Sequence, residues 1–192
     1  MFRYLILALA FLIGAPAVAE SPSYNYIQAG YQEIDIDFGD GLDVDGDGYG
    51  VNASFEIGDH MFGFATYAKS DFDFGVDMDQ WQAGLGYHTG VTDNTDFFIS
   101  AAYVDAKVSA SGLGSFSEDG YGASVGIRSN VSDLIELFGE VAYVDLGSGS
   151  DDTAVGAGIC FNFTESFALA LSASAGSDIT TYGAGARIYF GN

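Results

Sequence analysis

The chain has 192 residues, of which 27 are glycine, and carries a formal net charge of −22 at pH 7. Only five Lys and Arg stand against 27 Asp and Glu, so the chain lacks the basic surface that a nucleic-acid partner requires. The single cysteine, Cys160, excludes an intramolecular disulfide. No helical period or linker interrupts the sequence, which therefore indicates one all-β domain.

Residues 1–19 have the features of a cleaved signal peptide. Arg3 precedes an uncharged apolar run from Leu5 to Ile13, and Ala17-Val18-Ala19 supplies a small-residue cleavage site before Glu20. A membrane anchor needs roughly 20 apolar residues, and this run is about half that length. We therefore expect residues 20–192 to form the exported domain.

Strand-like alternation recurs about ten times along the exported part. In Gln80–Tyr87, one parity is apolar and the other is small or polar, as expected when successive side chains point to opposite faces of a strand. The expected strands, in chain order, are near residues 24–36, 48–57, 61–70, 79–89, 96–107, 120–130, 135–146, 153–163, 167–176 and 180–190. In the third of these, both parities are largely apolar, so the sequence leaves open which parity faces inward.

The connections alternate between short turns and longer acidic segments. The short ones are 58–60, 90–95, 131–134 and 164–166, and the longer ones are 38–47, 71–78 and 108–119. Even strand number, spans of about 9–11 residues and this alternation are typical of an up-and-down antiparallel transmembrane β-barrel, with its short turns in the periplasm. We predict such a barrel with about ten strands, the last paired to the first.

Large aromatic residues on the outward parity fall at two levels, as expected for rings at the two membrane interfaces. The predicted outer aromatic belt is Tyr31, Tyr49, Trp81, Tyr103, Tyr121, Tyr143 and Tyr182. The predicted inner aromatic belt is Phe55, Tyr87, Phe97, Phe161, Phe167 and Phe190.

The inward parity carries charges that could pair in the lumen. Across the short turn at 131–134, Arg128 should lie beside Glu136, and we hypothesise an ion pair that Glu140, Glu56 and Arg187 extend. Such a network could gate a pore, but unpaired charges in a lumen are costly, and we favour simple pairing as the reason for it.

The first long connection contains Asp43-Val44-Asp45-Gly46-Asp47-Gly48, a spacing of carboxylates that resembles the start of a calcium loop, with Gly48 at the sixth position, where a sharp turn is expected. Its twelfth position is Ser54 rather than Glu, so the motif is partial. Asp43, Asp45 and Asp47 are the candidate ligands, and calcium is the one cofactor we consider. The alternative is a solvated acidic loop. The remaining acidic residues of the outer rim could hold divalent cations against lipid phosphates or provide solubility in a salty medium that screens their repulsion, and the sequence does not decide between the two.

Several segments resemble small Gram-negative outer-membrane β-barrel domains of the OmpA/OmpX-like kind. They are Ser23-Tyr24-Asn25-Tyr26, Gly30-Tyr31, Asp79-Gln80-Trp81 with Gly84-x-Gly86-Tyr87, and Asn94-Thr95-Asp96. The resemblance implies a barrel in the bacterial outer membrane, in contact with its lipids and inserted by the barrel-assembly machinery. Such barrels act variously as structural elements, adhesins or small pores.

We expect no enzymatic activity, because the two histidines, His60 and His88, map to the periplasmic end, away from any site in the outer leaflet. The expected function is a structural or surface-interaction role through the acidic loops, with an extracellular partner that the sequence does not identify. The alternative is a small cation-preferring pore, suggested by the acidic mouth and the small lumen residues.

Overall fold

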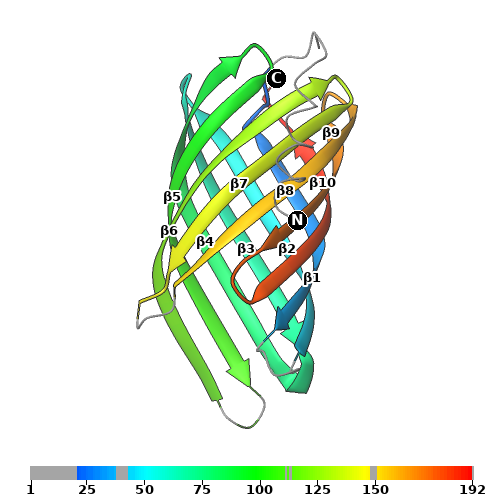
Figure 1. The fold of residues 1–192 in the computed structure, drawn as a ribbon. Coiled ribbons are helices and arrows are strands. Elements are labelled where there is room, and N and C mark those ends of the chain that lie inside the picture. The colour runs from blue at the N-terminus through cyan, green and yellow to red at the C-terminus, as the bar shows by residue number, and fades with distance from the viewer. Residues whose placement is uncertain (1–20, 38–42, 111, 113, 148–150, 192) are drawn as a thin grey trace.

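A computed structural model of the chain describes residues 21–37, 43–110, 112, 114–147 and 151–191, and the expected signal peptide lies outside them. The described residues form ten antiparallel strands and one 3-10 turn, η1 (Asp73–Gly75), in a single barrel (Figure 1). The strands are β1 (Tyr26–Asp37), β2 (Asp43–Ile57), β3 (Met61–Phe72), β4 (Val76–Thr92), β5 (Thr95–Ala110), β6 (Gly114–Ser132), β7 (Ile135–Asp145), β8 (Asp151–Thr164), β9 (Phe167–Ala175) and β10 (Ile179–Tyr189).

The barrel closes through the first and last strands, which confirms the predicted up-and-down architecture. Each strand pairs with its neighbours in sequence, and β1 pairs with β10 from Tyr26 opposite Tyr189 to Ile36 opposite Ile179. Closure leaves neither β1 nor β10 with a free edge, so backbone groups within the ladder have partners without the help of water.

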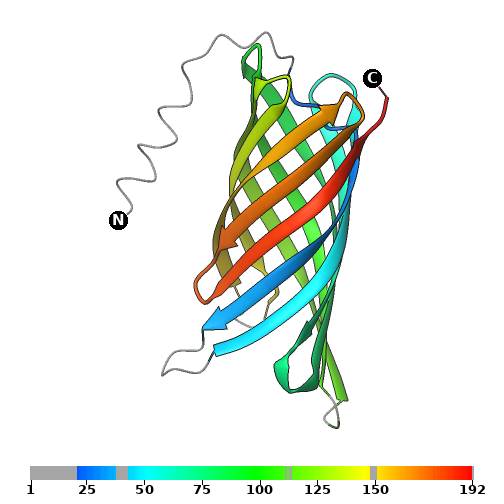
Figure 2. The same ribbon diagram turned by 90° about the vertical axis from the view of Figure 1, so that its right-hand side faces the viewer.

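The two ends of the barrel differ in their connections. The short turns and the C-terminus lie at one end, which we call the inner end, and the longer connections lie at the other, the outer end (Figures 1 and 2). Gly58, with φ of +69°, makes the turn between β2 and β3 at the inner end, a conformation that favours glycine. Strand β1 runs from the inner end to the outer end.

The wall is taller on one side. Strands β4, β5 and β6 have 17, 16 and 19 residues, whereas β9 and β10 have 9 and 11, so the β5–β6 hairpin projects beyond the rest of the outer end (Figure 1). The prediction of long loops at 38–47, 71–78 and 108–119 is therefore wrong for 43–47, 71–72, 76–78, 108–110 and 114–119, which lie in strands, whereas 38–42, 111 and 113 lie outside the described residues. In 43–48 the acidic residues alternate with Val and Gly, and in 71–78 Asp71 and Asp77 are each flanked by non-acidic residues, so a period of two continues these strands past the belt of outward aromatic residues.

The structure decides the phase of β3. Phe62, Phe64 and Ala68 line the lumen, whereas Ala65 and Tyr67 lie on the outer surface. Glycines on neighbouring strands make room for the inward rings: Phe62 lies against Gly86, and Phe64 lies against Gly84. A Cβ atom at either glycine would collide with the ring, so ring and glycine together fill this part of the lumen.

The outer surface is apolar between the two levels of aromatic residues. Exposed side chains there include Val51, Leu85, Ile99, Val125, Val155, Leu171 and Ile188. An apolar surface that encircles the barrel is far larger than the patches soluble monomers expose, and hydrocarbon is the medium that suits it. No helix among the described residues has the length and apolar character needed to cross a membrane.

A small buried cluster lies inside the lumen. It consists of Cys160, Ala168 and Ala170, which pack against Phe138 and Tyr189.

Candidate functional site

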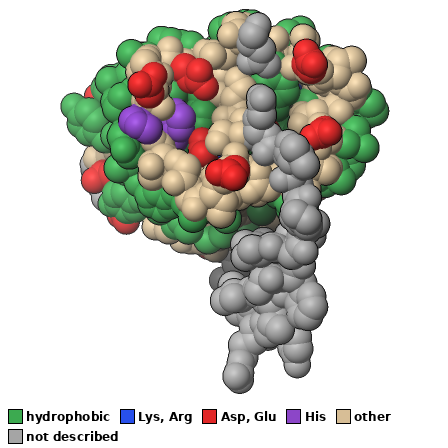
Figure 3. Space-filling view, turned by 90° about the horizontal axis from the view of Figure 1, so that it is seen from above, with side chains coloured by type: hydrophobic (Ala, Val, Ile, Leu, Met, Phe, Trp, Pro, Cys, Tyr) green, Lys and Arg blue, Asp and Glu red, His purple; other side chains and the backbone are tan. Residues whose placement is uncertain are grey.

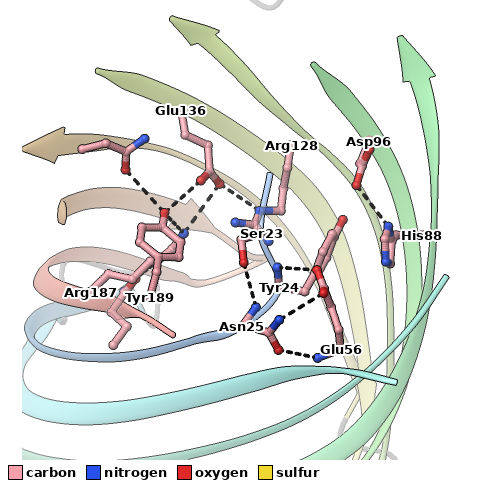
Figure 4. Close-up of polar contacts among 12 residues, drawn as sticks. Ser23, Tyr24, Asn25, Glu56, His88, Asp96, Arg128, Glu136, Arg187 and Tyr189 are labelled. Atoms are coloured by element: carbon pink, nitrogen blue, oxygen red, sulfur yellow. Dashed lines mark hydrogen bonds and ion pairs between the residues drawn. The ribbon is translucent and has the colours of Figure 1, made fainter. Parts of the chain in front are cut away.

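The inner end of the lumen holds a buried ion pair between adjacent strands. Arg128 on β6 donates from Nε to Oε1 of Glu136 on β7 at 2.8 Å, and the two residues are 6% and 1% exposed (Figure 4). Arg187 on β10 approaches the same carboxylate oxygen with its Nη1 at 3.6 Å. Two guanidinium groups therefore share one carboxylate, and each compensates for the water that Glu136 lost on burial.

Aromatic and amide groups complete this cluster. The hydroxyl of Tyr189 donates to Oε2 of Glu136 at 3.1 Å, and Arg187 donates from Nε to Oε1 of Gln28 at 2.9 Å. The guanidinium carbon of Arg187 lies 4.1 Å from the centre of the Tyr26 ring. These hydrogen bonds and the ring contact stabilise the buried charges of Glu136 and Arg187.

The segment before β1 enters the lumen and lies on this cluster. The ring of Tyr24, 2% exposed, stacks on His88 at 4.2 Å and on Phe62 at 4.6 Å, measured between ring centres. The guanidinium carbon of Arg128 lies 4.6 Å from the centre of the same ring. Burial raises the pKa of Tyr24 well above the ordinary value of a tyrosine, so its phenol stays neutral. The prediction that strand one begins at residue 24 is wrong, because Tyr24 fills the lumen instead of joining the ladder.

Glu56 on β2 fixes this segment, which we call the Tyr24 latch (residues 23–25). Its carboxylate accepts from the Tyr24 backbone N–H at 3.3 Å and from Nδ2 of Asn25 at 3.0 Å. In return, the Glu56 backbone N–H donates to Oδ1 of Asn25 at 2.9 Å (Figure 4). Beside the latch, Nδ1 of His88 lies 3.1 Å from Oδ2 of Asp96. The latch and the cluster below it fill the lumen at the inner end.

The surface of this end is acidic. In the view from the inner end, acidic and histidine side chains are visible and no Lys or Arg is seen (Figure 3). The four short turns each carry one acidic residue, namely Asp59, Asp93, Asp133 and Glu165. Arg128 and Arg187 are 6% and 5% exposed, so both arginines of the lumen are shielded from the solution.

On the outer side of the cluster, the lumen opens into a cavity of about 700 Å³. Its charged lining residues are Arg128 and Arg187 at the floor and Glu140 on the wall. Amide and hydroxyl side chains line its middle, and they include Gln28, Gln32, Asn52, Thr66, Ser70, Gln80, Gln82, Ser100, Ser124, Ser172 and Ser174. Apolar side chains line the outer part, and they include Ile34, Ile36, Phe72, Met78, Val144 and Ile179.

The predicted lumen network divides into three parts. The structure brings Arg128, Glu136 and Arg187 together, whereas Glu56 binds the latch and Glu140 faces the cavity.

The predicted lumen network does not include Tyr24 and Tyr189. Tyr189 has the inward parity of β10 and follows Arg187 by two residues. This position could have predicted that Tyr189 contributes to the cluster. Tyr24 belongs to a segment that carries the family resemblance, but its inward turn depends on tertiary contacts and could not be predicted from the sequence.

The candidate calcium ligands Asp43, Asp45 and Asp47 lie on strand β2, with their side chains on the outer surface. Gly48, expected at a sharp turn, instead lies in the ladder opposite Gln32 and Ser70. The expectation of a turn there is wrong, because the alternation of Asp with Val and Gly is compatible with extended backbone. Among the described residues, no three His, Cys, Asp or Glu side chains are grouped to hold a metal ion.

These aspartates belong to an acidic outer rim. Asp45 lies opposite Asp35, and Asp47 lies between Glu33 and Asp71 on the neighbouring strands. A surface depression of about 430 Å³ is lined by Glu33, Asp35, Asp45, Asp47, Asp71 and Asp73, together with Tyr31, Gly46 and Phe72. Like charges directly opposite each other on a sheet destabilise it unless cations or water screen them.

The aromatic residues predicted for the outer belt lie on the outer surface next to this rim. Trp81 and Tyr103 have ring centres 5.4 Å apart, and Tyr103 and Tyr121 are 5.9 Å apart. Tyr67 joins them and donates its hydroxyl to Asp79 at 2.8 Å. At the inner level, Phe163 is exposed beside Phe167, with ring centres 6.3 Å apart. Sequence reasoning left out Tyr67 because the phase of its strand was open.

Solved structures with the same fold include porins and an autotransporter translocator domain. A KdgM porin in complex with disordered oligogalacturonate has a TM-score of 0.52 and 13% identity, over 86% of this chain and 99% of that one. The translocator domain of autotransporter NalP from Neisseria meningitidis has a TM-score of 0.52 and 12% identity, over 98% of this chain and 94% of that one. Neisserial surface protein A (NspA) has a TM-score of 0.49 and 16% identity, over 88% and 98%.

At these identities the solved structures show the fold alone, and no curated protein sequence matches the chain. The family model of the outer membrane protein beta-barrel domain matches residues 5–163, which is most of the chain. This match agrees with the closed barrel, its apolar girdle and the resemblance carried by the strand motifs. The chain therefore belongs to the outer membrane protein β-barrel domain family and is a protein of the bacterial outer membrane.

Proposed function

We propose that this protein is a closed, non-conducting barrel that acts at the cell surface through its acidic outer rim. The observation that carries the first part is the filled inner end of the lumen. Tyr24, Arg128 and Glu136 are all at least nine-tenths buried there, and they are held by contacts from four strands. A continuous aqueous path would have to displace a stacked ring and separate a buried ion pair, which is costly.

The charge distribution supports the second part. The outer rim places carboxylates opposite one another on successive strands, beside the outward aromatic residues and outside the apolar girdle. At that level they meet lipid head groups and the external medium. Divalent cations that bridge these carboxylates to lipid phosphates, or a partner with a basic surface, would relieve the repulsion. Insertion by the barrel-assembly machinery is part of the same proposal, and the proposal includes no enzymatic activity.

Planar-bilayer recording tests the closed state. We expect the purified barrel to give no reproducible conductance steps in a salt solution at either polarity. Regular open steps in the unmodified protein, altered by Glu136→Gln, would overturn the closed-barrel proposal. A detergent blank and a known porin in the same bilayers distinguish silence from failed insertion, and proteolysis of reconstituted vesicles verifies that the barrel is inserted.

Calorimetry tests the role of the rim. We expect calcium to bind the wild-type barrel more tightly than a variant in which Asp43, Asp45 and Asp47 are all changed to Asn. A matched control changes Asp59, Asp93 and Asp133 of the inner turns to Asn, with the same loss of charge. Equal heats of calcium binding for all three proteins would rule out Asp43, Asp45 and Asp47 as calcium ligands and the rim as a cation-binding surface.

One observation favours the second candidate, a small cation-preferring pore. The cavity of about 700 Å³ ends at the Tyr24 latch, in which the Tyr24 backbone N–H and the Asn25 side chain donate hydrogen bonds to Glu56 on the wall. Such a latch could open. If it gates a pore, Tyr24→Ala combined with Glu56→Gln should produce cation-selective steps that the wild type lacks. A silent double variant, shown to be folded and inserted, would eliminate the pore.

A further inference from the structure

Glu140 is a charged side chain in the lumen that the inner cluster does not use. It lies on β7, faces the cavity and is exposed within it. Its cross-strand neighbours are Gly126 on β6 and Gly156 on β8, so no side chain flanks the carboxylate at its own level. The Ser124 hydroxyl, on the neighbouring strand β6, lies within hydrogen-bonding reach of this carboxylate. The sequence thus leaves open space around this carboxylate.

The cations of the lumen are engaged elsewhere. Among the described residues, no Lys, Arg or His nitrogen lies within ion-pair distance of Glu140. Arg128 is directed to Glu136 and to the Tyr24 ring, and Arg187 is directed to Glu136, Gln28 and the Tyr26 ring. A carboxylate at membrane depth that lacks an ion-pair partner is costly, and such residues commonly belong to ligand sites.

Aromatic rings line the cavity near this carboxylate. Phe98 lies against Gly126, the direct neighbour of Glu140. Phe138 lies against Gly158, which is two residues after Gly156, the other neighbour of Glu140. Phe64 lines the opposite part of the wall. Aromatic faces together with a carboxylate are the groups that recognise organic ammonium ions, through cation–π attraction and charge.

The approach from outside favours the same ligand class. The acidic rim and the net charge of −22 concentrate cations at the outer end and repel anions. Beyond the rim, the apolar side chains of Ile34, Phe72 and Val144 form the outer lining of the cavity, where they would contact alkyl groups. A bare metal ion fits less well, because Glu140 is the single carboxylate among the described lining residues and hard cations require several oxygen ligands.

We propose that the lumen binds a small organic ammonium ion, with its charge on Glu140, its methyl or methylene groups on Phe98 and Phe138, and its polar substituents on the surrounding amides and hydroxyls. The cavity of about 700 Å³ lies in the size range of small-molecule sites. The cavity lies on the outer side of the Tyr24 latch, so in this proposal the ligand enters from the outer end and the latch stays in place.

The test uses choline as the probe and its uncharged isostere, 3,3-dimethylbutan-1-ol, as the matched ligand. Binding is measured by calorimetry and by NMR saturation transfer on the full barrel in a maltoside detergent, which carries no ammonium group. We expect saturable binding of choline. The affinity should fall by about tenfold or more for the isostere and for Glu140→Gln, since loss of the charge pair removes the main attraction.

Asp105→Asn serves as the matched control, because it removes the same charge from the outward face of β5, away from the cavity. We expect its choline affinity to stay within about twofold of the wild type. Heat-modifiable migration and circular dichroism verify that each variant is a folded barrel. The proposal is overturned if choline does not saturate, if Glu140→Gln binds choline as the wild type does, or if the isostere binds equally well. Because the assay measures binding, a silent barrel in conductance experiments leaves this test unaffected.

Discussion

Glu136 and Glu140 lie four residues apart on the inward face of β7, yet they differ in burial and in their ion-pair partners. Glu136 is 1% exposed and receives two guanidinium groups and a tyrosine hydroxyl, whereas Glu140 faces a cavity without an ion-pair partner. At the inner end, protein groups replace water around the charge. In the outer half, the cavity leaves room for water or a ligand to do so. The same residue type on one strand can thus serve to close the lumen or to receive a ligand.

Loss of the inner carboxylate should have the largest effect. Glu136→Gln leaves Arg128 and Arg187 buried without a counter-charge, and we expect the free energy of unfolding to fall by about 3–5 kcal/mol. Glu140→Gln should change it by about 0.5 kcal/mol or less, because that carboxylate has no ion pair to lose. Urea unfolding in lipid vesicles gives both values. Similar losses for the two variants would abolish the distinction between the two regions.

A double-mutant cycle sharpens the comparison at the level of one pair. We expect Arg128→Met and Glu136→Gln to couple by about 1–3 kcal/mol, because the two groups are in direct contact and buried. The corresponding cycle between Arg128→Met and Glu140→Gln should give coupling below about 0.5 kcal/mol. Additive effects for the first pair would contradict the ion pair as the organising contact of the inner end.

High pH provides a test of the Tyr24 latch. The pKa of Tyr24 is raised in the folded barrel, so above about pH 10 the unfolded chain releases this proton while the folded chain keeps it. Stability should then fall as pH rises, by about 1.4 kcal/mol per pH unit from this residue. Tyr24→Phe should lack this component while the other tyrosines titrate as before. Parallel stability curves for the two proteins between pH 9 and 11 would show that Tyr24 is accessible to water.

The smallest effect is expected at the outer rim. Asp47 lies between Glu33 and Asp71, so Asp47→Asn should raise the urea midpoint slightly at low salt by removing repulsion. The gain should vanish near 1 M salt, where the screening length is about 3 Å. Asp59→Asn, at an inner turn, is the control with no expected gain. A loss of stability at low salt would mean that Asp47 makes a favourable contact.

The sequence predicts the barrel well because the residues of each strand alone show which side chains face the lumen and which face outward. Apolar and polar residues alternate along Gln80–Tyr87 whatever the rest of the chain does, and each predicted strand overlaps the observed one. Strand ends were harder to predict, since the acidic stretch at Asp43–Gly48 fits either an extended strand or a loop. The phase of β3 was open for a similar reason, because Phe62 and Tyr67 are both large and apolar.

Within the lumen, the sequence determined which side chains point inward but left their partners undecided. Arg128 and Glu136 flank one short turn, so their proximity follows from local sequence. The third member, Arg187, reaches Glu136 only because barrel closure and curvature bring β10 within reach of β7. Glu56 binds the Tyr24 latch instead of the arginines, and Glu140 faces open space between two glycines. Local alternation is a property of each strand, whereas the pairing of inward charges depends on distances across a closed barrel.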